Sequence, residues 1–386
     1  MDLAMQSVIG AIHASSTRAV LCLAGGASQA VGWILSVPGA SETILEVSVP
    51  YSRISMMQLL GKMPDQFVSE TTAKDMAYAT YNRSLQLSVP GTPVVGIGFT
   101  GTLVSAVPKR GDHRCHVCAR MRDHIWEYQF TFTKGLRNRE KEDFVASQIL
   151  IKALASSSCV NIDIPIDIQG TEKLMETQTH LDEASQIREL IEGRICMLPY
   201  TYGAGFASDD NSRRVILSGS FNPLHEGHLK LMDTACSMIG GVPIFEISVV
   251  NADKPPLSFD EIKSRAAQFE AAGKTVIFTS QPYFFKKAEL FPNSTFVVGA
   301  DTAVRLVNPK YYDGSHSRML EVLHGMQNLG CDFLVAGRMV DGHYLTFVDL
   351  NIPDDLEMLF KAIPAEAFRV DISSTEIRGR QAAGSA

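Results

Sequence analysis

Two histidines stand three residues apart in the stretch LSGSFNPLHEGHLKL, where a strand-like run gives way to a helix-like run. Side chains at this spacing share one face of a helix, so His225 and His228 would project together. Gly227 between them has no Cβ and lets a ligand approach the backbone. The start of a helix offers free N–H groups and a positive dipole end, which suit a phosphate group. Two imidazoles there could hydrogen-bond a phosphorus centre as negative charge builds on it.

The same pattern has an ordinary alternative, in which both histidines are surface residues at a helix cap, and H-x-G-H alone does not separate the two. A second stretch, DISSTEIRGR, favours the phosphate interpretation. Ser373 and Glu376 fit the capping box of any helix start. Ser373, Ser374 and Thr375 would also add hydroxyl and N–H donors. Arg378 would add a permanently charged planar donor. Two anion-binding helix starts in one domain predict a polyphosphate held between them.

The elements that must position these residues alternate between strand-like and helix-like runs from residue 213 onward. Strand-like runs cover residues 213–219, 243–250, 275–280, 294–300 and 332–338; helix-like runs cover residues 227–238, 258–272 and 316–326. Strands separated by helices indicate a mainly parallel, doubly wound, Rossmann-like sheet. Ligands of such sheets bind at the carboxyl ends of the strands, and His225 follows the first of these strands.

The earlier part of the chain has the same mixed α/β character, so we expect two α/β domains. Strand-like runs cover residues 18–24, 93–99, 114–121 and 126–132; helix-like runs cover residues 70–87 and 139–155. Between the two parts lies a strongly acidic stretch that contains an amphipathic helical run over residues 181–195. The pattern predicts a first domain over residues 1–160, an acidic helical connector over 161–211 and a second domain over 212–386.

Length and composition exclude several classes of protein. With 386 residues, 45% hydrophobic and 20% charged, the chain suits a two-domain globular protein. No apolar run approaches the roughly 20 residues that span a bilayer, and the start resembles neither a signal nor a transit peptide. The net charge of −7 gives no basic excess for nucleic acid. Seven scattered cysteines do not form a disulfide framework. We expect a reduced, cytoplasmic homo-oligomer that binds neither nucleic acid nor membrane.

The paired stretches GSFNPLHEGH and ISSTEIR resemble the nucleotidyltransferases of the HxGH superfamily over roughly residues 213–382. Within that superfamily the nicotinamide and nicotinate mononucleotide adenylyltransferases are the most similar, which implies a role in NAD biosynthesis. Cytidylyltransferases typically carry an Arg-Thr-x-Gly-x-Ser-Thr-Thr run where this chain has ISSTEIR, so ATP is favoured over CTP. Class I aminoacyl-tRNA synthetases share a similar histidine signature, but this chain has nothing like their Lys-Met-Ser-Lys-Ser loop.

The resemblance implies roles for individual residues. His225, His228 and Arg378 would be catalytic, because they would stabilise charge on the phosphates in the transition state. The nucleotide-binding residues implied by the resemblance are Gly219, Ser220, Phe221, Asn222, Gly227, Lys254, Gly299, Asp301, Ser373, Ser374 and Thr375. Two of them have ordinary alternatives: Asp301 could be a helix N-cap, and Lys254 a solvated loop lysine.

The implied reaction transfers AMP from ATP to a phosphomonoester and releases pyrophosphate. A phosphomonoester has a second pKa of about 6 and is already a dianion at neutral pH, so no general base is needed. No carboxylate cluster predicts a resident metal, and Mg²⁺ would arrive with ATP. The acceptor stays open, because the aromatic residue that the adenylyltransferases stack on the pyridine ring is missing from TAVRLVNPKYYDG; Tyr311 or Tyr312 could substitute.

The first part, from about residue 17 to 155, resembles the C-terminal domain of the CinA (competence-damage-inducible) family, through LSVPGASETILEVSVPYSRISMMQLLG, VSETTAKDMA and VVGIGFTGTL. Many members are nicotinamide-nucleotide amidohydrolases. Cys22 stands where the family has its serine nucleophile, and Met56 where it has a lysine. The resemblance therefore implies a degenerate amidase whose role is oligomerisation or ligand sensing. Gly25 and Gly26 fit either a ligand pocket or a buried turn.

Cys115 and Cys118 form a C-x-x-C with histidines nearby, but no second C-x-x-C follows and the run alternates like a strand, so we predict no zinc there. Three hypotheses for the whole chain follow. The first is a mononucleotide adenylyltransferase, the second a bifunctional enzyme that also deamidates the mononucleotide, and the third a non-catalytic nucleotide sensor. Intact His225, His228, Ser374 and Arg378 favour the first over the third, because a pure sensor has less need for all four.

Overall fold

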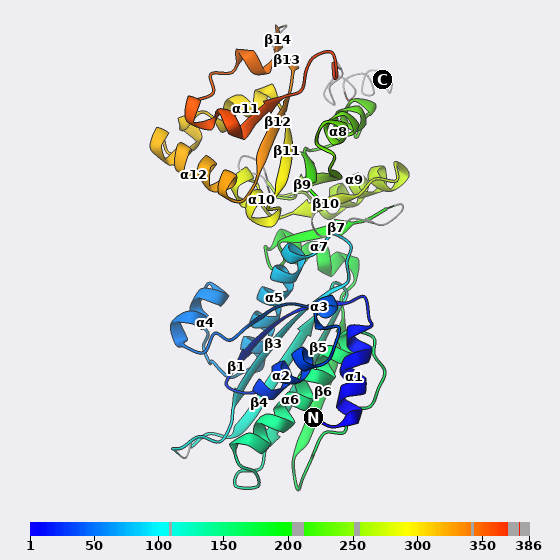
Figure 1. The fold of residues 1–386 in the computed structure, drawn as a ribbon, viewed down its shortest axis with the longest axis vertical. Coiled ribbons are helices and arrows are strands. Elements are labelled where there is room, and N and C mark those ends of the chain that lie inside the picture. Colours follow the sequence, from blue (N-terminus) through cyan, green and yellow to red (C-terminus); the bar gives the residue numbers. More distant parts are fainter. Residues whose placement is uncertain (108–109, 203–211, 251–254, 341–342, 370–377, 379–386) are drawn as a thin grey trace. The chain divides into compact units, whose positions relative to one another are not determined.

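The computed structural model describes residues 1–107, 110–202, 212–250, 255–340, 343–369 and 378. The chain divides into two compact units, Met1–Gln186 and Ile187–Ala386. Each unit is built from a β-sheet and helices (Figure 1), as the prediction of two α/β domains requires. No helix in the described part of the chain is both long enough and apolar enough to cross a bilayer.

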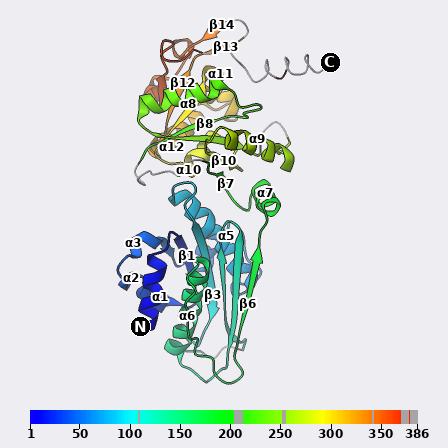
Figure 2. The same ribbon diagram turned by 90° about the vertical axis from the view of Figure 1, so that its right-hand side faces the viewer.

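The first unit has a mixed sheet in the order β2-β1-β3-β4-β5-β6. Strands β1, β3 and β6 of this sheet are labelled in Figure 2. Its strands are β1 (Arg18–Ala24), β2 (Ile44–Ser48), β3 (Val94–Thr102), β4 (His113–Arg120), β5 (His124–Phe132) and β6 (Lys173–His180). The first three pair in parallel, and β4, β5 and β6 follow antiparallel. The helices are α1 (Leu3–His13), α2 (Ser28–Ser36), α3 (Ala40–Thr43), α4 (Arg53–Leu60), α5 (Glu70–Leu87) and α6 (Arg139–Ser157).

The main core of this unit lies between the sheet and helices α1, α2 and α6, while α5 covers the opposite face. Strand β3 carries glycines on the face beneath α5. A Cβ at Gly96 would lie 2.0 Å from the backbone nitrogen of Tyr81, and one at Gly98 would lie 2.2 Å from the carbonyl oxygen of Ala73. Helix and strand therefore pack backbone to backbone, at a separation that leaves no room for any side chain on these two residues.

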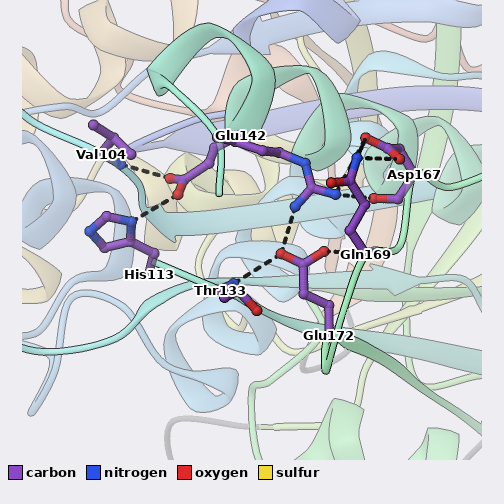
Figure 3. Close-up of polar contacts among 8 residues, drawn as sticks. Val104, His113, Thr133, Glu142, Asp167, Gln169 and Glu172 are labelled. Carbon is purple, nitrogen blue, oxygen red and sulfur yellow. Dashed lines mark hydrogen bonds and ion pairs between the residues drawn. The ribbon is translucent and has the colours of Figure 1, made fainter. Parts of the chain in front are cut away.

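Two buried carboxylates tie the irregular segments of the first unit to its sheet (Figure 3). Glu142 on α6 accepts a hydrogen bond from the Val104 N–H at 2.7 Å and lies 2.8 Å from Nδ1 of His113. Glu172 accepts from the Thr133 N–H at 2.9 Å and pairs with Arg137 at 2.6 Å. Both carboxylates are fully buried, and their donors supply the partners that a buried charge requires.

The predicted acidic connector differs from the structure. Within residues 161–211, β6 completes the first sheet by pairing with β5, and β7 (Met197–Tyr200) pairs antiparallel with a strand of the second sheet. Helix α7 (Glu183–Ile191) lies between them and matches the predicted helical run. The division of the chain into two units therefore falls within α7, and the sequence pattern missed both strands. Strand β6 is exposed along most of its length, so it lacks the apolar alternation that marks a strand.

The second unit has a sheet in the order β15-β12-β11-β8-β9-β10-β7, parallel except for β7. Its further strands are β8 (Arg214–Ser218), β9 (Val242–Ser248), β10 (Val276–Thr279), β11 (Ser294–Gly299), β12 (Asp332–Ala336) and β15 (Phe360–Ala362). Its helices are α8 (Glu226–Ile239), α9 (Phe259–Ala271), α10 (Phe284–Leu290), α11 (Ala300–Leu306) and α12 (His316–Asn328). Helices α8 and α9 lie on one face of the sheet, and α10 and α12, which contact each other, lie on the other (Figure 1). The doubly wound sheet is confirmed.

The close approach of α5 to β3 gives a stability test. We expect Gly98→Ala to destabilise the first unit by about 3 kcal/mol, because the new methyl group would overlap a backbone carbonyl that cannot rotate away. Urea unfolding followed by circular dichroism would measure the change. Gly32→Ala is the matched control: Gly32 lies in α2 with nothing within 4 Å of its added Cβ, so the substitution should stabilise by up to about 1 kcal/mol. Equal midpoints for the two variants would contradict this packing.

Candidate active site

The second sheet has one place where its connections diverge. From β8 the chain proceeds to β9 and β10 on one side, and then crosses to β11, β12 and β15 on the other. Loops leaving the carboxyl ends of β8 and β11 consequently turn in opposite directions and leave a crevice between them, which is where open α/β sheets bind ligands. The H-x-G-H stretch follows β8 directly, so its histidines are delivered to this crevice.

The crevice contains a cavity of about 360 Å³. The predicted site residues that line it are Gly219, Ser220, Phe221, His225, Gly227, His228, Gly299 and Arg378. Asn222 and Asp301 lie beside it without lining it. Lys254, Ser373, Ser374 and Thr375 lie outside the described residues. The H-x-G-H stretch and the end of β11 are thus brought together, although they are far apart in sequence.

The two histidines form a stacked pair at the start of α8. His225 is the N-cap residue, and the rings lie with centroids 3.6 Å apart and planes inclined by 23°. The backbone N–H of His225 donates to Nδ1 of His228 at 3.3 Å. Because Nδ1 of His228 accepts a hydrogen bond, the neutral ring carries its proton on Nε2. That N–H is the donor that His228 can offer to a ligand in the cavity.

Both rings are held in the neutral form. Burial lowers the pKa of His228 to about 3, and the charges of His225 and Arg338 add to the shift. Burial and the charge of Arg338 also lower the pKa of His225. A proton on either ring would lie against another ring and near a guanidinium, so it is unfavourable until a negative ligand enters.

Two polar atoms of the cavity wall are buried without a partner among the described residues: Oγ of Ser218 and Nδ1 of His225. Ser218 is the last residue of β8, the strand that the H-x-G-H stretch follows, and it lines the cavity. A buried polar atom without a hydrogen bond costs roughly 1–3 kcal/mol. Such atoms at the wall of a cavity are explained when a polar ligand forms the missing hydrogen bonds with them.

Phe221 sets the floor of the site. It is 1% exposed and adopts a left-handed backbone conformation with φ of 42°. Its ring packs edge-on against His228 at 4.9 Å, and a Cβ on Gly219 would lie 2.9 Å from the ring. The turn after β8 therefore folds back beneath the histidines and supports the ring of His228 from below. The peptide bond between Asn222 and Pro223 in this turn is cis.

Two arginines bring positive charge to the cavity. Arg378 donates to the carbonyl oxygen of Asn222, which links the far end of the chain to the turn after β8. Arg338 follows β12 and pairs with Asp301 at 3.3 Å. The helix N-cap alternative for Asp301 is wrong, because Gly299 is the N-cap of α11 and Asp301 lies in the first turn.

Sequence patterns missed several residues of the cavity wall. Thr302, Phe284, Phe368 and Arg338 line the cavity, and Arg338 could have been found because it closes a predicted strand at the carboxyl edge. Phe284, Thr302 and Phe368 carry no pattern that separates them from core residues. The predicted stacking residues do not line the cavity in the described part of the chain: the Tyr312 hydroxyl donates to the carbonyl of Leu306, and Tyr311 is exposed.

The first unit brings Cys22 and Met56 together with Met76 in one small apolar cluster. Cys22 is fully buried, and burial raises the pKa of its thiol to about 11, with a hydrogen bond from Ser48 opposing the shift. A thiol in this state is a poor nucleophile, which argues against the deamidase of the bifunctional hypothesis. Gly25 is a turn glycine with φ of 87°, and a Cβ on it would lie 1.9 Å from the carbonyl oxygen of Gly101.

Comparison with known families bears on the second unit. Residues 216–380 match the cytidylyltransferase-like family model. This part of the chain is a cytidylyltransferase-like domain. The match spans the H-x-G-H stretch, the cavity and Arg378, and it supports nucleotidyl transfer as the role of the domain. No curated protein matches the chain.

Solved structures of the CinA group are similar to part of the chain. The competence/damage-inducible protein CihA from Agrobacterium tumefaciens is 16% identical, with 42% of this chain and 100% of that chain covered and a TM-score of 0.32. A CinA superfamily protein from Escherichia coli is 12% identical, with 41% and 88% covered and a TM-score of 0.32. A competence or damage-inducible protein from Enterobacter asburiae is 16% identical, with 41% and 96% covered and a TM-score of 0.31.

The protonation of His228 can be tested directly. We expect its ring to stay neutral, as the Nε2–H tautomer, from pH 8 down to pH 5, because its pKa in the folded protein is about 3. Long-range ¹H–¹⁵N NMR spectra would report the tautomer, and the urea-unfolded chain, in which histidine titrates near pH 6.5, is the reference. Since the unfolded chain binds the extra proton first, this histidine contributes stability above about pH 6.5 that is lost as the pH falls toward 3. Titration of the folded ring near pH 6.5 would refute the assignment.

The buried thiol of the first unit gives a second test. At pH 8 we expect Cys159, which is exposed, to react promptly with a disulfide reagent, and Cys22 to react at the rate of unfolding. Mass spectrometry of labelled peptides, with and without urea, would separate the two. Prompt labelling of native Cys22 would revive a nucleophilic role for it.

Proposed function

We propose that the second unit transfers AMP from ATP to the phosphate of a small phosphomonoester, with nicotinamide or nicotinate mononucleotide as the acceptor. The observation that carries this proposal is the neutral, stacked histidine pair at the start of α8, inside a cavity at the point where the sheet connections diverge. The match of residues 216–380 to the cytidylyltransferase-like family supports the reaction class. The choice of ATP over CTP rests on the ISSTEIR stretch.

In this proposal the α-phosphate of ATP lies at the start of α8. The acceptor phosphate, already a dianion, attacks the α-phosphorus, and the new P–O bond forms as the bond to the β-phosphate oxygen breaks. The bonding electrons leave with pyrophosphate. Nε2–H of His228 donates to the phosphate oxygen on which charge grows. A neutral donor suits this task, because its interaction strengthens as the oxygen becomes more negative.

The two arginines and the start of α8 would offset the negative charge of the ATP phosphates. Arg378 and Arg338 line the cavity and would neutralise the departing phosphates. Asp301 holds Arg338 in place by its ion pair. None of the described residues that line the cavity is a carboxylate, so the proposal assigns no protein ligand to Mg²⁺. Mg²⁺ enters the proposal as the companion of ATP, bound through the phosphates.

The apolar part of the cavity lining suits a flat ring. Leu217, Val297 and Phe284 offer apolar and aromatic surface. A pyridine ring could lie against that surface while its ribose phosphate faces the histidines. Phe284 is thus proposed in the place of the tyrosines expected from the sequence. Action in the cytoplasm as a homo-oligomer, without a nucleic-acid or membrane partner, stays a prediction.

The test is pyrophosphate release from ATP or CTP with Mg²⁺ and a panel of acceptors: nicotinamide mononucleotide, nicotinate mononucleotide, FMN and phosphopantetheine. We expect turnover with ATP and a pyridine mononucleotide. His228→Asn keeps a group near the Nδ1 position but removes the Nε2 donor, so kcat should fall by roughly 100-fold or more. His316→Asn, at an exposed residue of α12, should leave kcat unchanged.

The outcomes of that assay are distinct. Turnover with CTP and not ATP would keep the reaction class and overturn the proposed nucleotide. Turnover with FMN or phosphopantetheine alone would overturn the proposed acceptor. No turnover with any pair, by a protein that still binds ATP, would favour the nucleotide-sensor hypothesis.

A further inference from the structure

Strands β5 and β6 place two histidines opposite each other in the first unit. His124 and His180 are direct partners in the antiparallel ladder, so their Cβ atoms are separated by roughly 5 Å. Asp123 precedes His124 in the turn between β4 and β5, and its carbonyl oxygen accepts from the N–H of Leu181 at 2.7 Å. The backbone therefore fixes the three residues relative to one another without any help from their side chains.

The side chains of these residues already converge. Nδ1 of His124 lies 3.0 Å from Oδ1 of Asp123, and the rings of His124 and His180 lie 5.0 Å apart, edge to face. One nitrogen or oxygen from each of the three lies within 4.8 Å of the other two.

Two imidazoles and one carboxylate are a ligand set for a divalent transition-metal ion. Bonds of about 2.0–2.1 Å in tetrahedral geometry separate neighbouring ligand atoms by roughly 3.3 Å. The contact between His124 and Asp123 is already close to that separation. His180 and Asp123 are exposed, so their side chains can rotate the further distance that the third ligand needs. The exposed side of the site leaves a coordination position for water.

The position of these three residues also suits a metal ion that would hold the edge strand β6 to the rest of the sheet. β6 is the last strand of the sheet and is exposed along most of its length; beyond its ladder, Leu174 packs against the main core and Glu176 pairs with Lys152 of α6. An ion bound by His124 and His180 would join β5 to β6 where the strand ends. Trp126 stacks on His124, with ring centroids 5.3 Å apart, and so would sense the ion.

We propose that His124, His180 and Asp123 bind a divalent transition-metal ion of the Zn²⁺ and Cu²⁺ class, which fastens β6 to the sheet. The site differs from the C-x-x-C considered in the sequence. Cys115 and Cys118 lie on opposite faces of β4, because residues an odd number apart in a strand point opposite ways, so they cannot hold one ion. The proposal is independent of the nucleotide site, and neither stands or falls with the other.

The experiment uses the full chain with Trp33→Phe, which leaves Trp126 as the tryptophan reporter. Cu²⁺ should quench its fluorescence saturably, with a Kd in the micromolar range, and Zn²⁺ should compete. In the same background, His180→Ala and Asp123→Asn should each raise the Kd at least tenfold. The control His316→Ala, at an exposed histidine of the second unit, should leave it unchanged.

A second measurement separates binding to this site from metal held by other histidines. Zn²⁺ should raise the melting temperature in the chain with His316→Ala and not in the chain with His180→Ala, because an ion that binds only the folded site stabilises it. An unchanged Kd in His180→Ala, or quenching that does not saturate below 1 mM Cu²⁺, would overturn the proposal. Loss of quenching in His180→Ala together with loss of the thermal shift would establish it.

Discussion

The candidate site depends on one constraint, the divergence of the chain on either side of β8. Parallel strands present their carboxyl ends at the same edge, and helices normally cover the space beside each connection. Where the next strand lies on the other side, as β11 does beside β8, no connection covers the crevice between them. A helix start, a glycine turn and an arginine can then approach one ligand from different strands. The cavity follows from this topology before any side chain is considered.

Within the crevice, burial gives His228 its chemical character. Packing of Phe221 beneath the ring and of His225 on its face removes water, which lowers the pKa and keeps a neutral Nε2–H donor in place. The same packing leaves Ser218 and His225 with unpaired buried atoms. A protein whose own groups formed hydrogen bonds with these atoms would be more stable. In the proposed function, the nucleotide supplies the missing hydrogen bonds.

In the first unit, burial has a different consequence for ionisable groups. Glu142 and Glu172 are buried and fully partnered, and they hold the segments around the sheet (Figure 3). Cys22 is buried among methionines, where a thiolate would be unstable. Ionisable groups that are close together and still reachable by solvent occur where β5 begins and β6 ends, in Asp123, His124 and His180. Cys22 is thus kept as an unreactive thiol in the interior, while the proposed metal ligands lie at the edge of the sheet.

The sequence by itself determined the long apolar elements and the local chemistry. The predicted helix over 70–87 is α5, the run RAVLCLA is β1, and the H-x-G-H stretch begins α8, because periodicity and helix capping are properties of neighbouring residues. Only the tertiary structure decided which distant residues meet. Strand β6 has no apolar alternation and exists because β5 pairs with it, and Phe284, Arg338 and Ser218 reach one cavity through the strand order. Such contacts depend on the order in which the strands pair, which cannot be predicted from the pattern of neighbouring residues.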